Sequence, residues 1–286
     1  MIAARMNGAA PGRMAGRGHR PPPLLLRVIP LQLYAGRSWV VLERNLRVCR
    51  RSWMIIVSGF FEPVFYLLAL GAGLGALVGT VDAGAGPVSY AAYIAPGLLA
   101  TSAMNGALYD STVNVFFKMK YAKLYDAMLA TSLGPMDVAL GEIAWSLLRG
   151  GIYSTGFVTV MLVMGLIESW WALLVVPVAL LIALGFGAVG MAITTYMKTF
   201  QQLDWINTAI LPMFLFATTF YPLSVYSPGI QVVVRCLPLY QGIELMRGLC
   251  LGIVSWGLLW HVLYFLVMAA VGIVLTSRRL DRLLLR

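Results

Sequence analysis

Long apolar blocks dominate the pattern of hydrophobic and polar positions along the chain. A helix needs about 20 apolar residues to cross the roughly 30 Å of hydrocarbon in a bilayer. Most of the blocks reach this length, and they are not the short alternating runs that are typical of soluble strands. They occupy residues 53–78, 91–117, 138–167, 170–196, 205–220 and 253–276. The pattern predicts an all-α membrane protein with six transmembrane helices.

The segment after the fifth block is apolar but broken. The fifth block is itself short, and Pro222, Pro228 and Pro238 interrupt the residues that follow it. Because proline removes a backbone donor and stops a helix, residues 221–251 do not predict a clean span. Irregular backbone at membrane depth is tolerated only where protein covers it. We expect a re-entrant or surface-lying pair of short helices here, on the extracytoplasmic side between spans 5 and 6.

A two-faced helical pattern over residues 31–51 precedes the first block. Its apolar positions recur at helical spacing and include Trp39, Leu42, Leu46, Cys49 and Trp53. Its basic positions are Arg37, Arg44, Arg47 and Arg51, of which three repeat every seven residues on the opposite side. This arrangement is typical of a helix that lies in the membrane interface. The basic face fits anionic lipid headgroups and a cytosolic partner equally well.

An arm rich in Arg, Gly and Pro begins the chain. Three consecutive prolines at 21–23 exclude a continuous helix there. The apolar run 24–26 is cut off by Arg27 and Pro30, so the arm lacks the uninterrupted apolar region of a secretory signal. We expect residues 1–30 to be a disordered, basic cytoplasmic arm and residues 31–286 to form one transmembrane domain.

Composition and charge turn this helical pattern into a topology. Apolar residues make up 60% of the chain and charged residues only 11%, so lipid is the solvent for most of it. Of the 21 Lys and Arg residues, 18 lie before the first block, after the sixth, or in the loops after the second and fourth. The positive-inside rule then places both termini of a multi-pass protein in the cytoplasm. We expect the membrane to be the plasma (inner) membrane. The net charge of +10 is a topology signal and does not indicate a nucleic-acid partner.

Several chemistries are absent from the sequence. It contains no Gly-Lys dipeptide, so the phosphate-binding loop that ends in Gly-Lys-Ser/Thr is missing. The histidines are His19 and His261, and we expect an interhelical hydrogen bond for the second. Cys49, Cys236 and Cys250 do not have metal-site spacing, and we favour unpaired thiols although Cys236 and Cys250 share one predicted side. We therefore expect a non-catalytic chain with no cofactor and no metal of its own.

The loop after the second block, residues 116–131, has a helical pattern of its own. Leu124, Ala127, Met128 and Thr131 share one face of a short amphipathic helix, and Ser132, Gly134 and Pro135 end the turn before the next helix. A short helix held between two spans forms a lever, because a motor subunit that binds it would move both spans together. A solvated basic loop that only fixes topology is an equally good interpretation.

Polar residues inside the apolar blocks are candidates for substrate contact. They are Glu62, Asn105, Asp110, Asn114, Glu142 and Arg149. A charge at membrane depth is costly unless it faces a partner or water, so these side chains should point into the protein. We expect Glu62 to pair with Arg149, and we favour polar interhelical contacts over a substrate path for the set. Gly71 and Gly75 have the spacing of a close helix contact.

Three segments carry a resemblance to a known family. They are residues 218–224 (TTFYPLS), residues 237–248 (LPLYQGIELMRG) and residues 93–106 (YIAPGLLATSAMNG). Together with the lever segment and the Gly141-Glu142 pair, they resemble the permease subunit of ABC-2 type exporters, in the branch that contains nodulation protein J. The resemblance runs from about Arg37 to the C-terminus.

This resemblance implies a six-span permease that works as a dimer, here expected to be a homodimer, with two copies of an ABC ATPase subunit that bind ATP and Mg. Such exporters move amphiphiles such as glycolipids, lipid-linked saccharides or drugs outward. The implied coupling helix contains Tyr121, Lys123, Leu124, Tyr125, Asp126, Ala127 and Met128. The implied exit cap contains Phe220, Tyr221, Pro222, Leu237, Pro238, Leu239, Glu244 and Arg247. The alternatives are a motor-independent channel or secondary transporter, and then a membrane-embedded enzyme.

Overall fold

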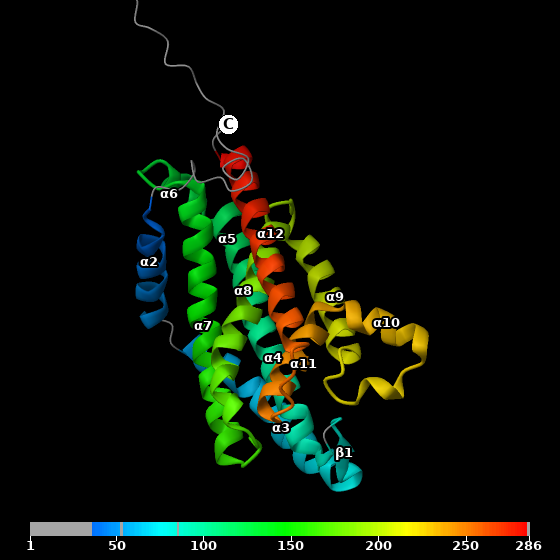
Figure 1. The fold of residues 1–286 in the computed structure, drawn as a ribbon. Helices are drawn as coiled ribbons and strands as arrows, with labels where there is room; N and C mark the ends of the chain where they lie inside the picture. The colour runs from blue at the N-terminus through cyan, green and yellow to red at the C-terminus, as the bar shows by residue number, and fades with distance from the viewer. Residues whose placement is uncertain (1–35, 52–53, 85, 285–286) are drawn as a thin grey trace, which may run out of the picture.

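The computed structural model describes residues 36–51, 54–84 and 86–284 (Figure 1). The predicted arm 1–30 and the first residues of the predicted interfacial helix lie outside these ranges, as does Trp53. The side chain of Arg51 is likewise outside the described part of the structure.

Helices make up most of the described chain. The long helices are α3 (Met54–Val78), α4 (Tyr90–Tyr109), α7 (Pro135–Val163), α8 (Val175–Thr194) and α12 (Leu258–Leu284). The shorter helices are α2 (Ser38–Arg51), α5 (Val115–Lys120), α6 (Leu124–Leu129), α9 (Leu203–Phe216), α10 (Pro228–Cys236) and α11 (Pro238–Cys250). One π-helical turn, η2 (Asp110–Asn114), joins α4 to α5, and 3₁₀ turns lie at η3 (Trp170–Leu174), η4 (Phe200–Gln202) and η5 (Leu223–Val225).

Four helical segments of the described chain are long and apolar enough to cross a membrane. They are Phe61–Val78, Pro135–Val163, Trp170–Thr194 and Leu258–Leu283. The second predicted span, 91–117, is divided here into α4, the π turn and α5, and the fifth corresponds to the 14-residue helix α9. The broken segment after α9 forms two short helices, α10 and α11, each of which begins with a proline at its first turn, where the missing donor costs nothing.

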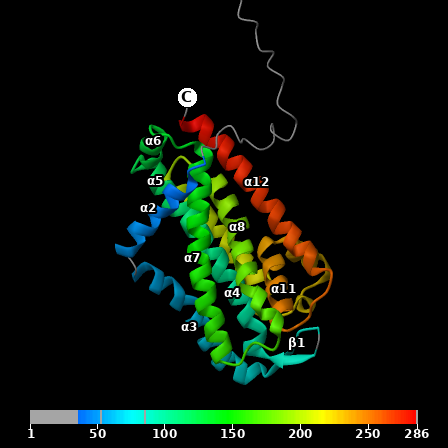
Figure 2. The ribbon, with the colours of Figure 1, turned by 60° about the vertical axis from the view of Figure 1, so that its left-hand side comes forward.

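Helix α8 lies at the centre of the bundle, between α4, α7 and α12 (Figures 1 and 2). Its inward side chains join Leu99, Phe157 and Phe265 in one hydrophobic core that also includes α11. Helix α2 lies along α7 on the outside of the bundle, whereas α9 and α10 project to one side in Figure 1. The apolar face that each long helix buries against its neighbours therefore fixes most of the arrangement.

A short β-hairpin departs from the predicted all-α fold. Strands β1 (Thr80–Asp82) and β2 (Pro87–Ser89) pair antiparallel between α3 and α4. The turn contains Gly84 in a left-handed conformation (φ 90°), and the backbone nitrogen of Gly84 donates to the Asp82 carboxylate over 2.9 Å. Strands of three residues are too short to produce an alternating pattern, so the apolar pattern gave no sign of them.

The bundle has two distinguishable ends. Helix α6 and the C-terminal end of α12 lie at one end, which we call the α6 end (Figure 1). The β-hairpin lies at the opposite end, which we call the hairpin end. The two ends provide the frame for the sites that follow.

Candidate functional site

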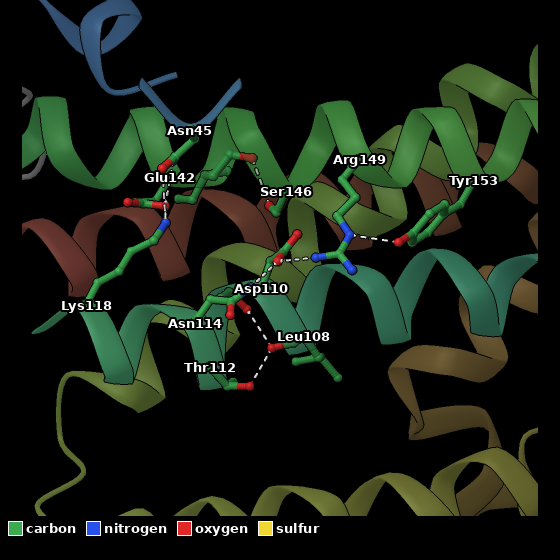
Figure 3. Close-up of polar contacts among 12 residues, drawn as sticks. Asn45, Leu108, Asp110, Thr112, Asn114, Lys118, Glu142, Ser146, Arg149 and Tyr153 are labelled. Atoms are coloured by element: carbon green, nitrogen blue, oxygen red, sulfur yellow. Dashed lines mark hydrogen bonds and ion pairs between the residues drawn. The ribbon is translucent and has the colours of Figure 1, made fainter. Parts of the chain in front are cut away.

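A buried ion pair joins two helices in the middle of the bundle (Figure 3). Arg149 of α7 donates from Nη1 to Asp110 Oδ1 over 2.7 Å and from Nε to the Tyr153 hydroxyl over 2.8 Å. Asn114 also donates to Asp110 Oδ1, over 2.5 Å. Asp110 and Arg149 are both buried, and each compensates the charge of the other. A charged group at membrane depth needs such a partner. The expected pair between Glu62 and Arg149 is wrong, because Asp110 takes this role.

The π turn explains why Asp110 reaches Arg149. A π turn inserts one extra residue into a helix and rotates the side chains that follow it. Here the hydroxyls of Ser111 and Thr112 donate to the Leu108 carbonyl, and Thr194 of α8 donates to the Ser111 carbonyl over 3.1 Å. The turn lies directly against Gly190, where an added Cβ would be only 2.3 Å from Ser111 Oγ. Close packing against α8 thus holds the turn that positions Asp110.

A cavity of about 520 Å³ lies beside this ion pair, between α3, α4, α7 and α9. Its polar lining includes Glu62, Asn105, Arg149 and Asn207, and its apolar lining includes Leu98 and Phe214. Cavities that bind small molecules in proteins typically measure about 300–1,000 Å³ and combine apolar walls with a few polar groups. The arrangement therefore has the size and the lining of a ligand site.

The structure brings some of the candidate path residues together and separates others. Glu62, Asn105 and Arg149 line the cavity, whereas Asp110 and Asn114 lie behind Arg149 in the ion-pair network. Asn207 of α9 is not among the candidates that the sequence indicates, although it lines the cavity. Asn207 is the one amide side chain in α9, and a polar amide within an apolar helix is the feature of the sequence that could have indicated it.

Glu142 belongs to a second polar cluster, closer to the α6 end (Figure 3). Lys118 of α5 donates to Glu142 Oε2 over 2.6 Å and to Asn45 Oδ1 over 3.2 Å. Asn45 of α2 in turn donates to Glu142 Oε2 over 3.0 Å. We call these three residues the α6-end cluster. It ties α2, α5 and α7 together. The sequence places Lys118 in the lever segment 116–131 and among the cytoplasmic charges, and it does not single out Asn45.

Helix α6 is attached to the bundle by one face. Tyr125 is fully buried and Met128 is buried, whereas Lys123, Asp126 and Ala127 are exposed. Burial, reinforced by the nearby Glu142 carboxylate, raises the pKa of Tyr125 well above its usual value. Its neutral ring therefore packs beside the α6-end cluster at any physiological pH.

The predicted face of α6 was partly wrong. Met128 lies inside as expected, but Ala127 and Thr131 are exposed and Tyr125 takes the inward position. The reason is a tight turn, in which Lys123 adopts a left-handed conformation (φ 45°) before the helix begins. That turn sets the rotation of α6, and a large aromatic residue fills the space against α7.

Helix α2 differs from its predicted pattern in the same way. Val41 and Asn45 form its buried stripe and Leu42 and Cys49 are half-buried, while Trp39 and Leu46 are exposed. The basic residues divide, since Arg37 and Arg47 are exposed and Arg44 is half-buried. The backbone nitrogen of Arg37 donates to Asp137 over 2.8 Å, and its guanidinium contacts Ser132, so the start of α2 is fixed to the loop between α6 and α7.

The predicted exit-cap residues surround a strained turn after α9. Thr218 has a left-handed backbone (φ 63°), which is unfavourable for a β-branched residue. The buried Arg247 of α11 donates to the Thr218 carbonyl over 2.7 Å and to Glu244 over 2.8 Å, and its guanidinium lies 4.0 Å from the centre of the Tyr93 ring. Phe220 packs against Phe214, with ring centres 5.1 Å apart.

The remaining exit-cap residues divide between the two flanking segments. Tyr221 and Pro222 precede the 3₁₀ turn η5, and Leu237, Pro238 and the fully buried Leu239 begin α11. Arg247 thus links α4, α9 and α11. The sequence analysis places Glu244 and Arg247 in the exit cap and Thr218 in the motif 218–224, and the structure joins the three through the Arg247 guanidinium.

The remaining side chains singled out in the sequence are His261 and the three cysteines. His261 of α12 bonds to the Gln241 side chain of α11, which confirms the expected interhelical hydrogen bond. Cys49, Cys236 and Cys250 are free thiols, as expected. Within the described ranges, no group of three His, Cys, Asp or Glu side chains is placed to hold a metal ion.

Comparison with known proteins identifies the type of molecule to which these features belong. The family profile described as ABC-2 type transporter matches residues 37–251, about three quarters of the chain. The chain belongs to the ABC-2 type transporter family. Its α6-end cluster, its cavity and the turn held by Arg247 all fall within the matched part of this ABC-2 permease.

Nodulation protein J of several rhizobia is similar to this ABC-2 chain. The protein from Rhizobium leguminosarum bv. viciae is 32% identical over 86% of this chain and 96% of its own length. The protein from Rhizobium meliloti (strain 1021) is 31% identical over 76% of this chain and 82% of its own length, and that from Neorhizobium galegae is 30% identical over 86% and 95%. The ABC-2 permease family is a membrane component of ABC transporters, and membership implies an ABC ATPase as a partner.

Proposed function

We propose that this ABC-2 permease exports an amphiphile, such as a glycolipid, a lipid-linked saccharide or a drug, across the plasma membrane. In this proposal two copies of the chain form a homodimer, and two copies of a separate ABC ATPase hydrolyse ATP. The chain itself crosses the membrane six times, and α10 and α11 form the re-entrant segment that covers the exit. Lipid surrounds the exposed apolar residues of the long helices.

The observation that carries the proposal is the attachment of α6. Its inward residues Tyr125 and Met128 are buried beside the α6-end cluster, while Lys123, Asp126 and Ala127 face away from the bundle. A partner that binds the outward face therefore acts on a helix that is rigidly connected to α2, α5 and α7. This is the arrangement that a coupling helix requires, since movement of a packed element passes to the helices against which it packs.

Charge supports a cytoplasmic position for the α6 end. Lys118, Lys120 and Lys123 lie at or beside α6, and Arg278, Arg279 and Arg282 lie at the C-terminal end of α12 (Figure 1). An excess of Lys and Arg marks cytoplasmic loops. The α6 end is therefore the side on which a soluble ATPase would bind, and the hairpin end faces outward.

The outward face of α6 gives a direct test. In the full complex purified with its ATPase, Ala127→Asp places a bulky charge on this face without disturbing the buried Tyr125 and Met128. We expect binding of the ATPase to weaken by roughly tenfold or more, as for a central interface residue, and ATP hydrolysis by the complex to fall with it.

The matched control is Gln201→Asp, an exposed position in the other loop at the same end of the bundle. It should leave ATPase binding and hydrolysis unchanged. An Ala127→Asp complex that hydrolyses ATP and exports cargo at the normal rate would contradict the proposal. Steady transport by the chain reconstituted alone would instead identify a motor-independent channel or secondary transporter.

A further inference from the structure

Charge in the cavity between α3, α4, α7 and α9 is unbalanced. Two ionised side chains line it, Glu62 and Arg149. Arg149 is already neutralised by the buried Asp110 at 2.7 Å. Glu62 forms no ion pair with any residue that the structure describes, so the cavity wall keeps one uncompensated negative charge.

Glu62 lies within a candidate membrane span, where an uncompensated charge is unfavourable. It is the second residue of the candidate span Phe61–Val78, and its side chain is exposed at the cavity. A carboxylate within a membrane helix is costly unless a cation or water compensates it, which makes an unpaired one a candidate binding group. Pro63 follows directly and is buried, so the local backbone is held by packing while the carboxylate stays accessible.

Aromatic rings accompany the carboxylate. Tyr66 is one helical turn after Glu62, Tyr109 is the last residue of α4, and both line the cavity with about half of their surface exposed. The face of a tyrosine ring attracts an ammonium group, and a carboxylate beside aromatic rings is a recurrent way of recognising organic cations. An anionic ligand would meet Glu62 without finding a free cation, because Arg149 is already paired.

We propose that this cavity binds amphiphiles that carry a protonated amine, with Glu62 as the carboxylate that recognises the amine and Tyr66 and Tyr109 as its aromatic walls. The apolar lining, including Leu98 and Phe214, receives the hydrocarbon part. The amine belongs either to a transported amphiphile or to the headgroup of an aminophospholipid. That the amine belongs to a transported amphiphile rests on the proposed export function. Binding of an amine in the cavity does not depend on that function.

Binding of dodecylamine to the full chain in nonionic detergent tests the proposal. Equilibrium dialysis with labelled dodecylamine should show saturable binding to the wild-type chain. Glu62→Gln keeps the size of the side chain and removes its charge, and it should weaken this binding by about tenfold or more, the scale of one desolvated charge contact. Dodecanol, which has the same chain and no charge, should bind equally to both.

The control variant is Asp204→Asn, which removes an exposed carboxylate at the start of α9, outside the cavity. It should bind dodecylamine like the wild type. Equal binding of dodecylamine by Glu62→Gln and wild type, or a preference of the wild type for dodecyl sulfate, would overturn the proposal. Because no ATPase takes part, the result is independent of whether export is ATP-driven.

Added phosphatidylethanolamine distinguishes the two sources. If it displaces dodecylamine from the wild-type chain, the site takes a lipid headgroup. If it does not, the amine belongs to a transported amphiphile.

Discussion

Two buried charge pairs carry the polar organisation of this permease. Arg149 with Asp110 and Lys118 with Glu142 are paired at 2.7 and 2.6 Å, and three of these four side chains are at least nine-tenths buried. By contrast, Glu43 and Arg47 form an exposed pair on the surface of α2. Removing one partner of a buried pair leaves an uncompensated charge, whereas an exposed pair contributes little.

At this scale, we predict the effect of removing Lys118. Lys118→Met leaves Glu142 unpaired beside Tyr125 and should lower stability by on the order of 3 kcal/mol. The double variant Lys118→Met with Glu142→Gln should recover most of this loss, because the glutamine is neutral and its oxygen still accepts from Asn45. Thermal unfolding in detergent, followed by the protein that remains monodisperse after heating, measures both.

Arg47→Met is the control for this pair of variants, since it makes the same change at an exposed site. It should shift unfolding little. A Lys118→Met chain as stable as the wild type, or a double variant no better than the single one, would show that the α6-end cluster does not hold the helices together.

At the scale of elements, the short helices α2, α5 and α6 all contact the long helix α7 at its α6 end. Helix α2 packs closely against α7 at Gly141, where an added Cβ would be 2.5 Å from Val41 Cβ and 2.8 Å from the Ser38 carbonyl oxygen. Because backbone atoms form part of this contact, no side-chain rearrangement relieves it. The absence of a side chain at Gly141 therefore permits the close packing of α2 on α7.

We predict that Gly141→Ala displaces α2 from α7. Overpacking of this kind costs about 1–3 kcal/mol, so thermal stability should fall and the peptide bonds of α2 should become more sensitive to limited proteolysis. If α2 and α6 act together, ATP hydrolysis by the complex should fall as well.

Gly75→Ala is the matched control. An added Cβ at Gly75 meets nothing within 4 Å, so this change should be neutral. Only Gly71 of the predicted small-residue pair contacts another helix, with its added Cβ 3.3 Å from the Cβ of Ala91. Equal proteolysis of the Gly141→Ala and wild-type chains would contradict the close-contact interpretation.

At the scale of the whole molecule, the two ends of the bundle differ in chemistry. The α6 end carries the clustered Lys and Arg residues, and the hairpin end carries the exposed strand residue Thr80. The native thiols do not allow the two ends to be compared: Cys250 is buried, burial raises the pKa of the half-buried Cys49, and Cys236 is the one exposed thiol among the three. New thiols at exposed positions serve better.

We predict that a membrane-impermeant maleimide distinguishes the two ends in sealed cells. With the three native cysteines replaced by alanine, Thr80→Cys should be labelled from outside. Ala130→Cys, which is exposed just after α6, should be labelled only after permeabilisation. Labelling of Ala130→Cys in sealed cells would reverse the orientation and exclude a cytoplasmic ATPase at α6.

The sequence by itself determined where most of the helices lie, which segment forms a short helix between two long ones, and which polar residues stand among apolar ones. These properties depend on the local order of apolar and polar residues and on the positions of prolines. The amino-acid sequence is therefore sufficient to predict them. The family resemblance likewise depended on short contiguous motifs around Pro222, Pro238 and Arg247.

Only the tertiary structure decided which of these residues meet. Arg149 pairs with Asp110, the first residue of the π turn, and not with Glu62. Tyr125, two residues after the left-handed turn at Lys123, replaces Ala127 on the inward face of α6. Neither turn changes the apolar pattern of the sequence, and the π turn is held by a hydrogen bond from Thr194 of α8, which lies 83 residues from Ser111 in the chain. Partner choice follows the relative rotation of packed helices, and that rotation is a property of the assembled bundle.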